Sequence, residues 1–588
     1  MTYRVKDMPA CKGCPFYQTG EQGFVPDEIN TGAKLAIIAQ NPGELEELDG
    51  RPLIGRSGQM VIASLGTYGI KREDASWLNV LKCRWQNENI LPREENILRG
   101  AVDHCTGAYL RQNLARIRPN LYVPMGDLAL HWLTGRENIG HWRGSVFIAD
   151  SGPIRGSKVL PTIHPAAIFR QPAWRSASKS DFSRIARELP KRELVVTYSD
   201  VFHLGVSAEE FINTIAALKG PVVLDIETKS TRPKSERKPI EETLAVIGIG
   251  WGKDVAANYV CDAALDEVLR AIESADVDWI AGGAFDFTVL THYGVKFKWE
   301  RCHDLILLHS RFDIELPHSI EFIASMWTDR AYWKHLTDTD LLLYNALDCA
   351  AEWEAWYRLA AFCKARAPLV WKVYMEDRPL IEVQVALHLA GMPTERGRIQ
   401  AEKRWYEKER ETAEKALLAA FGSTQGSATA VPVCATHKRY TGKSPLKARK
   451  GEAEVCSTCA AVRRSYIDSQ PLNLRSRPQM IRKLRESGIR VPLTREGKTS
   501  LAKGVVSKLL KKYNDPRLAQ LLNYWSKSTA VSRYFKEAWI SPATGRIHSV
   551  YSMHSAKHRW SCQKPNMQQT KRPEKVLESL GDIVETAE

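Results

Sequence analysis

Four acidic residues and a tyrosine, spread over the middle of the chain, have the types and spacing that metal-dependent hydrolysis requires. Asp225 and Glu227 end an apolar, β-branched run, and in a strand their side chains project from the same face. Asp286 follows an apolar, glycine-rich run, and Tyr344 and Asp348 share one face of an apolar-periodic helix. Acids from three segments can hold two divalent cations, Mg²⁺ or Mn²⁺, for phosphodiester hydrolysis, and the tyrosine can orient the attacking water. Taken alone, the first pair also fits two solvated acids at the end of a strand.

In this order the five residues resemble the DEDDy 3′–5′ exonuclease domain of family A DNA polymerases. Asp225 and Glu227 match its first motif, Asp286 its second, and Tyr344 with Asp348 its third. The resemblance implies that the four acids bind the two metal ions and that Tyr344 is catalytic.

The second motif departs from this family at its first position. The family usually has Asn there, whereas this sequence has Gly282 or Gly283, which weakens a substrate or structural contact and leaves the metal ligands intact. Asp304 is acidic where the family often has Asp, and we interpret it as a structural helix cap. We expect Cys261, Cys302, Cys349 and Cys363 to be buried thiols, because they share no ligand spacing.

The N-terminal part carries a second set of motifs. Cys11 and Cys14 form a C-x2-C pair, which alone would fit a redox pair or half a zinc site, and Cys83 and Cys105 follow. Buried strands open into turns at 40–43 and 79–84. A glycine-rich loop at 50–58 leads into a helix, and a Pro-Thr-Ile-His-Pro motif ends at residue 165. Together these resemble family 4 uracil-DNA glycosylases over roughly the first 190 residues.

This second resemblance implies a [4Fe–4S] cluster held by the thiolates of Cys11, Cys14, Cys83 and Cys105. It also implies a flipped uracil between the strand-end loops. Asn87 would contact the Watson–Crick edge of the base, and His164 would stabilise the charge on the departing base. The alternative for His164 is an ordinary polar loop residue.

Two departures leave the reaction of this domain open. Gln40-Asn41 replaces the family's Glu and small residue, and Leu53 stands where a Phe stacks on uracil. Losing that platform removes about 1–3 kcal/mol of stacking per base. Uracil excision, recognition of another base through Asn41, and a retained DNA-binding fold all remain open.

A third group of motifs lies in the C-terminal part. Four residues have the spacing of a structural zinc site, with a basic loop between them that can contact phosphates; incidental cysteines and a solvated charge run are the alternatives. The four are Cys434, His437, Cys456 and Cys459. Later motifs resemble the primer–template grip of family A polymerases, which implies DNA contacts for Arg559, Asn566 and Gln568. The sequence ends before that family's catalytic acids, so we expect a second polypeptide to supply the polymerase active site.

These residues require a multidomain α/β protein to position them. We predict a glycosylase-like α/β domain at 1–190, an RNase-H-like exonuclease domain at 191–367, and a mainly helical, thumb-like partial polymerase domain at 368–588, with a zinc-knuckle-like insertion at 430–462. With 83 Lys and Arg against 68 Asp and Glu, the net charge of +15 suits a polyanionic partner or simply gives a basic surface. The sequence contains no apolar run of membrane-spanning length and starts without an apolar signal core, which predicts a cytoplasmic protein.

The sequence therefore predicts a proofreading 3′–5′ exonuclease that forms the DNA-gripping part of a phage-type DNA polymerase. Its partners would be single-stranded 3′ ends and primer–template DNA. A uracil-DNA glycosylase for repair and a non-catalytic DNA-binding subunit are the alternatives.

Overall fold

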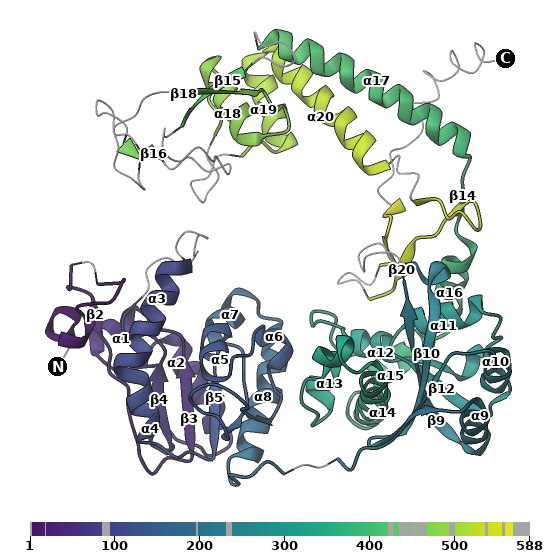
Figure 1. The fold of residues 1–588 in the computed structure, drawn as a ribbon, viewed down its shortest axis with the longest axis horizontal. Coiled ribbons are helices and arrows are strands. Elements are labelled where there is room, and N and C mark those ends of the chain that lie inside the picture. The colour runs from purple at the N-terminus through teal and green to yellow at the C-terminus, as the bar shows by residue number, and fades with distance from the viewer. Residues whose placement is uncertain are drawn as a thin grey trace. The chain divides into compact units, whose positions relative to one another are not determined.

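The protein is described here by a computed structural model that covers residues 3–17, 19–84, 95–195, 198–230, 238–421, 428–433, 446–447, 455–456, 466–492, 500–534, 539–554 and 559–567. The chain divides into two compact units. The first contains Met1–Ala390 and Ser549–Gln568, and the second contains Gly391–His548 and Gln569–Glu588. The first unit has two large sheets, one in an N-terminal domain (residues 3–189) and one in a middle domain (residues 198–390) (Figure 1).

A mainly parallel five-stranded sheet forms the core of the N-terminal domain. Its order is β4-β3-β5-β7-β6, and β6 alone of these runs antiparallel to its neighbour. Successive residues of β3 enter two different apolar clusters, one on each face, so both faces are covered. The strands are β3 (Leu35–Ala39), β4 (Ala75–Asn79), β5 (Leu121–Pro124), β6 (Phe147–Ile148) and β7 (Lys158–Val159).

Helices cover the two faces of this sheet. Residues of α2 and α8 belong to the cluster on one face, and residues of α3 and α5 belong to the cluster on the other. The main helices are α1 (Glu44–Asp49), α2 (Arg56–Gly66), α3 (Glu95–Cys105), α4 (Arg111–Ala115), α5 (Asp127–Thr134), α6 (Ile139–Trp142), α7 (Pro165–Arg170) and α8 (Trp174–Glu188).

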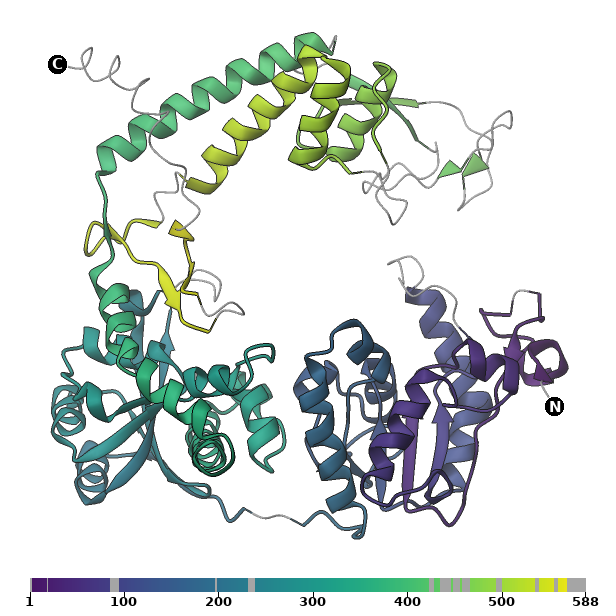
Figure 2. The ribbon, with the colours of Figure 1, turned by 180° about the vertical axis from the view of Figure 1, so that it is seen from behind.

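The middle domain is built on a six-stranded mixed sheet of order β13-β12-β9-β10-β11-β8. Strands β9 and β12 are parallel, so their carboxyl ends reach the same edge, whereas β10 is antiparallel to β9. Helices α9 and α10 pack together on one side of the sheet, and the long α14 packs against β9 and β10 from the other (Figures 1 and 2). The strands are β8 (Val201–Val206), β9 (Gly220–Lys229), β10 (Thr243–Gly252), β11 (Val255–Val260), β12 (Val277–Ala281) and β13 (Cys302–Asp304).

Local signals place several helices of this domain. Ser207 caps α9 by accepting a hydrogen bond from the Glu210 amide at 3.2 Å. Asp304 caps α12 through the Leu307 amide at 2.7 Å, which confirms its structural role. The helices are α9 (Ala208–Ala217), α10 (Leu265–Ser274), α11 (Ala284–His292), α12 (Leu305–Phe312), α13 (Ile320–Trp327), α14 (Leu341–Arg366), α15 (Pro368–Asp377) and α16 (Leu380–Ala390).

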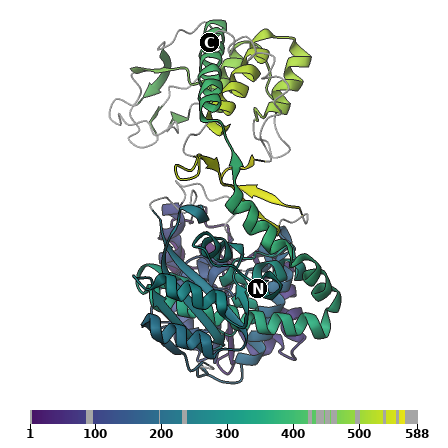
Figure 3. The same cartoon turned by 90° about the vertical axis from the view of Figure 1, so that its right-hand side faces the viewer.

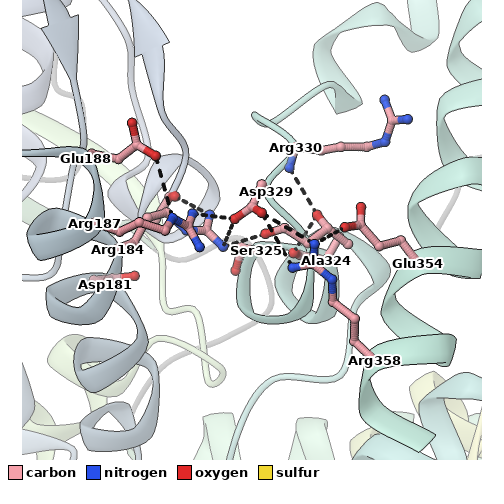
Figure 4. A network of polar contacts seen from close by, with 12 residues as sticks. Asp181, Arg184, Arg187, Glu188, Ala324, Ser325, Asp329, Arg330, Glu354 and Arg358 are labelled. Carbon is pink, nitrogen blue, oxygen red and sulfur yellow. Dashed lines mark hydrogen bonds and ion pairs between the residues drawn. The ribbon is translucent and has the colours of Figure 1, made fainter. Parts of the chain in front are cut away.

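The two domains of the first unit meet along α8 and α13, in a contact that we call the domain joint (Figure 4). Arg143 and Asp181 form a fully buried ion pair, and Arg143 Nη1 donates to Ser325 Oγ at 2.7 Å. Arg184 donates to the carbonyl oxygens of Gly144 and Thr328, so one side chain bridges the two domains. The joint is completed by Arg187, Asp329 and Arg358, which are linked by ion pairs.

The described residues of the second unit are mainly helical. Helices α17 (Arg396–Ala420) and α20 (Pro516–Tyr534) pack side by side (Figures 1 and 3). An apolar cluster joins the end of α17 to α18 (Arg477–Glu486), α19 (Lys503–Tyr513) and α20. Three short antiparallel pairs also lie here: β14 (Met392–Pro393) with β19 (Arg546–Ile547), β15 (Ala428–Val433) with β18 (Tyr466–Pro471), and β16 (Leu446–Lys447) with β17 (Val455–Cys456).

At the level of a multidomain α/β protein, the predicted fold class is confirmed. The predicted boundary at 367/368 falls between α14 and α15, inside the first unit, and residues 549–567 pack in that unit through β20 (Val550–Ser552) and β21 (Ser561–Gln563). Within the described part of the chain, no helix is both long and apolar enough to cross a membrane.

Candidate functional sites

The strand order of the N-terminal sheet reverses at β3, between β4 and β5. The chain passes from β3 to β4 on one side and then to β5 on the other, and such a switch point is where open α/β sheets bind ligands. The loop after β3 begins at Gln40, and Glu46 ties it to the glycine-rich loop by accepting the Gly55 amide at 3.0 Å. Gly58 allows the glycine-rich loop to close, because a Cβ there would lie 1.8 Å from the Leu53 carbonyl oxygen.

His164 lies at this edge, after β7, as the N-cap of α7. Its Nδ1 accepts the Ala166 amide at 3.2 Å, which leaves the hydrogen of a neutral ring on Nε2. Burial, with a smaller effect of Arg170, lowers the pKa of His164 to about 4, so the ring is neutral at physiological pH. A neutral Nε2–H can donate to a group that gains negative charge.

The other residues predicted at the base site differ from His164 in their surroundings. Leu53 is buried in the apolar cluster that packs against α2, with φ of 52°, so its side chain contributes to the core. Asn41 donates to its neighbour's carbonyl oxygen, Pro42 O, at 2.8 Å. Asn87 lies outside the described residues.

Four cysteine side chains line one small cavity of the N-terminal domain: Cys11, Cys14, Cys83 and Cys105. None forms a disulfide. Tyr109, in a π-helical turn that directly follows Cys105, lies 3.1 Å from Cys11 Sγ, and the Lys82 amide donates to Cys105 Sγ at 3.3 Å. Burial raises the pKa of Cys105 to about 11 and raises that of Cys83 further, and nearby cysteines add to both effects. Four thiols around one cavity could hold a metal cluster, which would stabilise their thiolate forms against this burial.

The middle domain brings together predicted acids from two segments, and the charge of Asp286, from the third, acts on one of them, Asp225. Asp225 and Glu227 lie near the carboxyl end of β9, Asp286 in the first turn of α11 after β12, and Asp348 on α14. Asp225, Glu227 and Asp348 each offer an oxygen, and these oxygens lie within 4.8 Å of one another. We call Asp225, Glu227, Asp286 and Asp348 the carboxylate centre.

The electrostatics of the centre favour cations. Burial raises the pKa of Asp225 well above its usual value, and the charges of the neighbouring acids raise it further. Burial likewise raises the pKa of Asp286 to about 8, against hydrogen bonds from its own amide and the Ile226 amide. Buried like charges are costly unless cations compensate them.

Two residues that we did not predict contact Asp348. Trp333 Nε1 donates to Asp348 Oδ1 at 2.7 Å, and Lys334 Nζ donates to Asp348 Oδ2 at 2.6 Å. Lys334 also donates to the hydroxyl oxygen of Tyr344 at 2.8 Å. Burial opposes the charge of Lys334, but Asp348 and Tyr344 hold its pKa well above the usual value. No sequence pattern marks these residues: Lys334 begins a short 3-10 helix (Lys334–Asp338) before α14, and Trp333 is the N-cap of that helix.

Two further unpredicted residues lie on the face of α14 that covers the sheet. Asn345 Nδ2 donates to Asp225 Oδ2 at 2.8 Å. Glu352 follows Asp348 by four residues and is 2% exposed, and its Oε2 is a buried atom without a hydrogen-bond partner. The helical spacing from Asp348 could have identified Glu352.

Gly282 explains how Glu352 fits. A Cβ at Gly282 would lie 2.6 Å from Glu352 Oε1, so the carboxylate occupies space that a side chain at residue 282 would need. Gly282 is one of the two glycines, with Gly283, at which the resemblance places the family's Asn.

The C-terminal candidates are only partly described. Cys434, His437, Cys459 and Gln568 lie outside the described residues, and Cys456 is described only as part of β17. The zinc site therefore stays a prediction. Arg559 and Asn566 are exposed at either end of the segment 559–567, and Arg559 and Trp560 line a cavity with Arg311. Cys302, Cys349 and Cys363 are buried free thiols, as predicted, and Cys261 is half-buried.

Comparisons with known proteins agree with parts of these assignments. The family model for the uracil DNA glycosylase superfamily matches residues 26–189. The type-4 uracil-DNA glycosylase of Archaeoglobus fulgidus is 30% identical over 194 residues, which cover 32% of this chain and 93% of that protein. The DNA polymerase of Bacillus phage SP01 is 26% identical over 357 residues, which cover 54% of this chain and only 36% of the polymerase.

Among solved structures, the POL domain of Pol1 from M. smegmatis, in complex with DNA primer-template and dNTP, matches with a TM-score of 0.45 and 12% identity. The match covers 63% of this chain and 56% of that one, and we base no conclusion on it. The glycosylase relative, in contrast, is covered over nearly its whole length. The residues matched by the family model contain His164 and two of the four clustered cysteines, Cys83 and Cys105. Through its N-terminal domain, the chain belongs to the uracil DNA glycosylase superfamily.

Proposed function

We propose that the middle domain is a 3′–5′ exonuclease that hydrolyses DNA 3′ ends with two Mg²⁺ or Mn²⁺ ions, and that the chain acts in DNA replication as part of a phage-type DNA polymerase. One observation carries the proposal: acids from separate segments converge until oxygens of Asp225, Glu227 and Asp348 lie within 4.8 Å of one another. The similarity to a phage DNA polymerase over about half of the chain supports the link to replication.

The donor set fits hard divalent cations. Carboxylate oxygens are the ligands that Mg²⁺ and Mn²⁺ prefer, and the unpartnered Glu352 Oε2 beside the centre is what a site built for cations would contain. When bound, the ions would supply a nucleophilic water and stabilise the leaving oxygen.

The chain's own residues orient the reactants. Lys334 donates to the Tyr344 oxygen, so the phenolic hydrogen is free to point elsewhere and can donate to a water or a phosphate oxygen. Asn345 holds Asp225, and Trp333 holds Asp348, in fixed orientations. Such preorganisation is how an active site avoids reorganising during the reaction.

The purified chain should degrade 3′-labelled single-stranded DNA in the presence of Mg²⁺. Asp225→Ala should lower the rate by about 10³-fold or more, because metal-assisted catalysis contributes several kcal/mol. Asp266→Ala is the matched control, since Asp266 is exposed on α10, on the other side of the sheet. An inactive wild-type chain, or equal activity of Asp225→Ala and wild type, would contradict the exonuclease.

A second candidate function is excision of uracil or another base by the N-terminal domain. The neutral His164, whose Nε2–H can donate at the edge of the sheet where the strand order reverses, favours it. The buried Leu53 argues for a base contact other than the family's aromatic stack. Uracil-containing DNA should break at the uracil after alkali, and His164→Ala should abolish this breakage, whereas the exposed His131 serves as the control.

The same domain is proposed to hold a [4Fe–4S] cluster on Cys11, Cys14, Cys83 and Cys105. Iron content and visible absorbance of anaerobically purified protein test this assignment. Cys83→Ser should lower both, and Cys261→Ser, in the middle domain, should change neither.

A further inference from the structure

Two charged residues that lie outside the sequence motifs flank Asp348 in the carboxylate centre. One is basic and the other is acidic. Lys334 contacts Asp348 Oδ2 from the segment before α14, and Glu352 lies one helical turn after Asp348. Both are largely buried, with side-chain exposure of 19% for Lys334 and residue exposure of 2% for Glu352. The two residues therefore flank Asp348 inside the protein, where solvent screens their charges weakly.

Glu352 belongs electrostatically to the centre. Among the charges that act on Asp225, that of Glu352 is the largest, ahead of Asp348, Asp286 and Glu227. No described hydrogen bond satisfies Glu352 Oε2. Burial, with the charges of Asp348 and Asp286, raises the pKa of Glu352 well above its usual value. Cations in the centre would stabilise the ionised carboxylate, which would then add a fifth negative charge to those of the four acids.

Lys334 carries the opposite charge to the same place. Besides Asp348 and Tyr344, its charge acts on Glu352. Two divalent cations would balance four of the five carboxylates, and the Lys334 ammonium would balance the fifth. Without Glu352 the centre would carry an excess positive charge, and without Lys334 an excess negative one.

We propose that Lys334 and Glu352 are a charge-compensating pair of positioning residues that sets the divalent-cation affinity of the carboxylate centre. Lys334 has the additional role of fixing the Tyr344 hydroxyl. This inference rests on the proposed exonuclease function and adds to it two residues that act through Asp348, Asp225 and Tyr344.

Mn²⁺ titration of the full chain, freed of metal by chelation, separates charge from structure. Lys334→Met should tighten Mn²⁺ binding and Glu352→Gln should weaken it, each by about 10- to 100-fold, which is the usual effect of residues that support metal ligands. The double variant should return close to the wild-type affinity. Loss of structure alone would weaken binding in every variant.

Three controls accompany the titration. Lys372→Met removes an exposed lysine from α15 and should leave the affinity unchanged. Lys334→Arg keeps the charge and should keep the affinity. If Lys334→Met does not fold, Lys334→Gln provides the neutral side chain.

Cleavage at saturating Mn²⁺ tests the second role. Lys334→Met should lower the single-turnover rate in the wild-type background and cause no further loss in Tyr344→Phe, because it acts through the phenol. Lys334 and Glu352 variants that shift Mn²⁺ affinity in the same direction, or not at all, would overturn this inference while leaving the exonuclease intact. A wild-type chain that neither binds Mn²⁺ nor cleaves DNA would overturn both.

Discussion

At the scale of single residues, the middle domain contains a carboxylate that packs against a glycine. Residue 282 has no side chain, and the Glu352 carboxylate occupies the space beside it. The neighbouring Gly283 differs, because a Cβ there would lie at an ordinary 3.4 Å from Ile306 Cδ1. Two adjacent glycines thus face different surroundings.

This difference predicts the effect of adding one methyl group. Gly282→Ala should destabilise the protein by about 1–3 kcal/mol, as overpacking does, because the new Cβ would meet Glu352 Oε1 at 2.6 Å and Ile320 Cδ1 at 3.0 Å. Gly283→Ala is the matched control and should cost less. Urea unfolding in the presence of a chelator measures both, and Gly282→Ala combined with Glu352→Ala should recover part of the loss. Equal effects of the two single substitutions would contradict this packing.

The candidate site was predictable to the extent that its residues follow regular spacing. Asp225 and Glu227 alternate in a strand, and Tyr344 and Asp348 are one helical turn apart, so residue type and period identified them. Lys334 was not predictable, because it reaches Asp348 from a separate short 3-10 helix (Lys334–Asp338), and no sequence period relates that helix to α14. A missing side chain at residue 282 indicates space but does not say which residue fills it.

At the scale of elements, α12 carries a buried histidine whose protonation the fold disfavours. His309 is fully buried, its Nδ1 lies 2.9 Å from His318 Nδ1, and its Nε2 has no hydrogen-bond partner. Burial, with a smaller effect of His318, lowers the pKa of His309 to about 3. The packing of α12 thus depends on a neutral imidazole.

Because of His309, the free energy of unfolding should decrease as the pH falls. An unfolded histidine has a pKa of about 6.5, so below that pH the unfolded chain binds a proton that folded His309 does not. Its contribution to stability is complete above about pH 6.5 and is lost as the pH falls toward about 3. His309→Asn keeps a polar atom near Nδ1 and does not titrate. Between about pH 6.5 and 5, wild type should lose about 2 kcal/mol more stability than this variant.

Urea unfolding of both proteins across this pH range measures the difference, which cancels the groups that titrate in both. His318, whose pKa burial also lowers, is one of these. Parallel pH profiles for the two proteins would show that His309 does not titrate differently in the folded and unfolded states.

At the scale of the whole first unit, the domain joint contains contacts that local sequence patterns do not predict. Arg143 and Ser325 are 182 residues apart, and Arg184 and Thr328 are 144 apart. The alternation of strands and helices indicated two α/β domains, because the apolar period is a local property. Which polar side chains meet across two domains depends on their docking, and no local pattern encodes it.

The buried pair in this joint should be important for stability. Asp181→Ala leaves Arg143 charged and buried without its partner, which costs about 3–5 kcal/mol for such pairs. Asp150→Ala removes the partner of Arg136 in an exposed pair, where Asp150 is 71% exposed, and should change stability by less than about 1 kcal/mol. Comparable destabilisation by both, measured by urea unfolding, would contradict this ranking.

The joint also reaches the carboxylate centre through three consecutive residues, Tyr332, Trp333 and Lys334. Tyr332 packs edge-on against Trp142 of the N-terminal domain, and its amide donates to Ser145 Oγ at 3.1 Å. The next two residues, Trp333 and Lys334, donate to Asp348. A short segment is thus fixed by one domain at its first residue and contacts the acids of the other domain at the next two.

This connection predicts an effect of the N-terminal domain on the proposed exonuclease. Trp142→Ala removes the ring that supports Tyr332, so Lys334 should be held less firmly on Asp348 and Tyr344, and DNA cleavage should slow by about tenfold, the rate effect of roughly 1.4 kcal/mol. Trp132→Ala is the control, since Trp132 stacks on Arg111 within the N-terminal domain. If Lys334 mediates the effect, Trp142→Ala should add little to Lys334→Met. Equal losses from the two tryptophan substitutions would mean that general destabilisation of the N-terminal domain, rather than this segment, transmits the change.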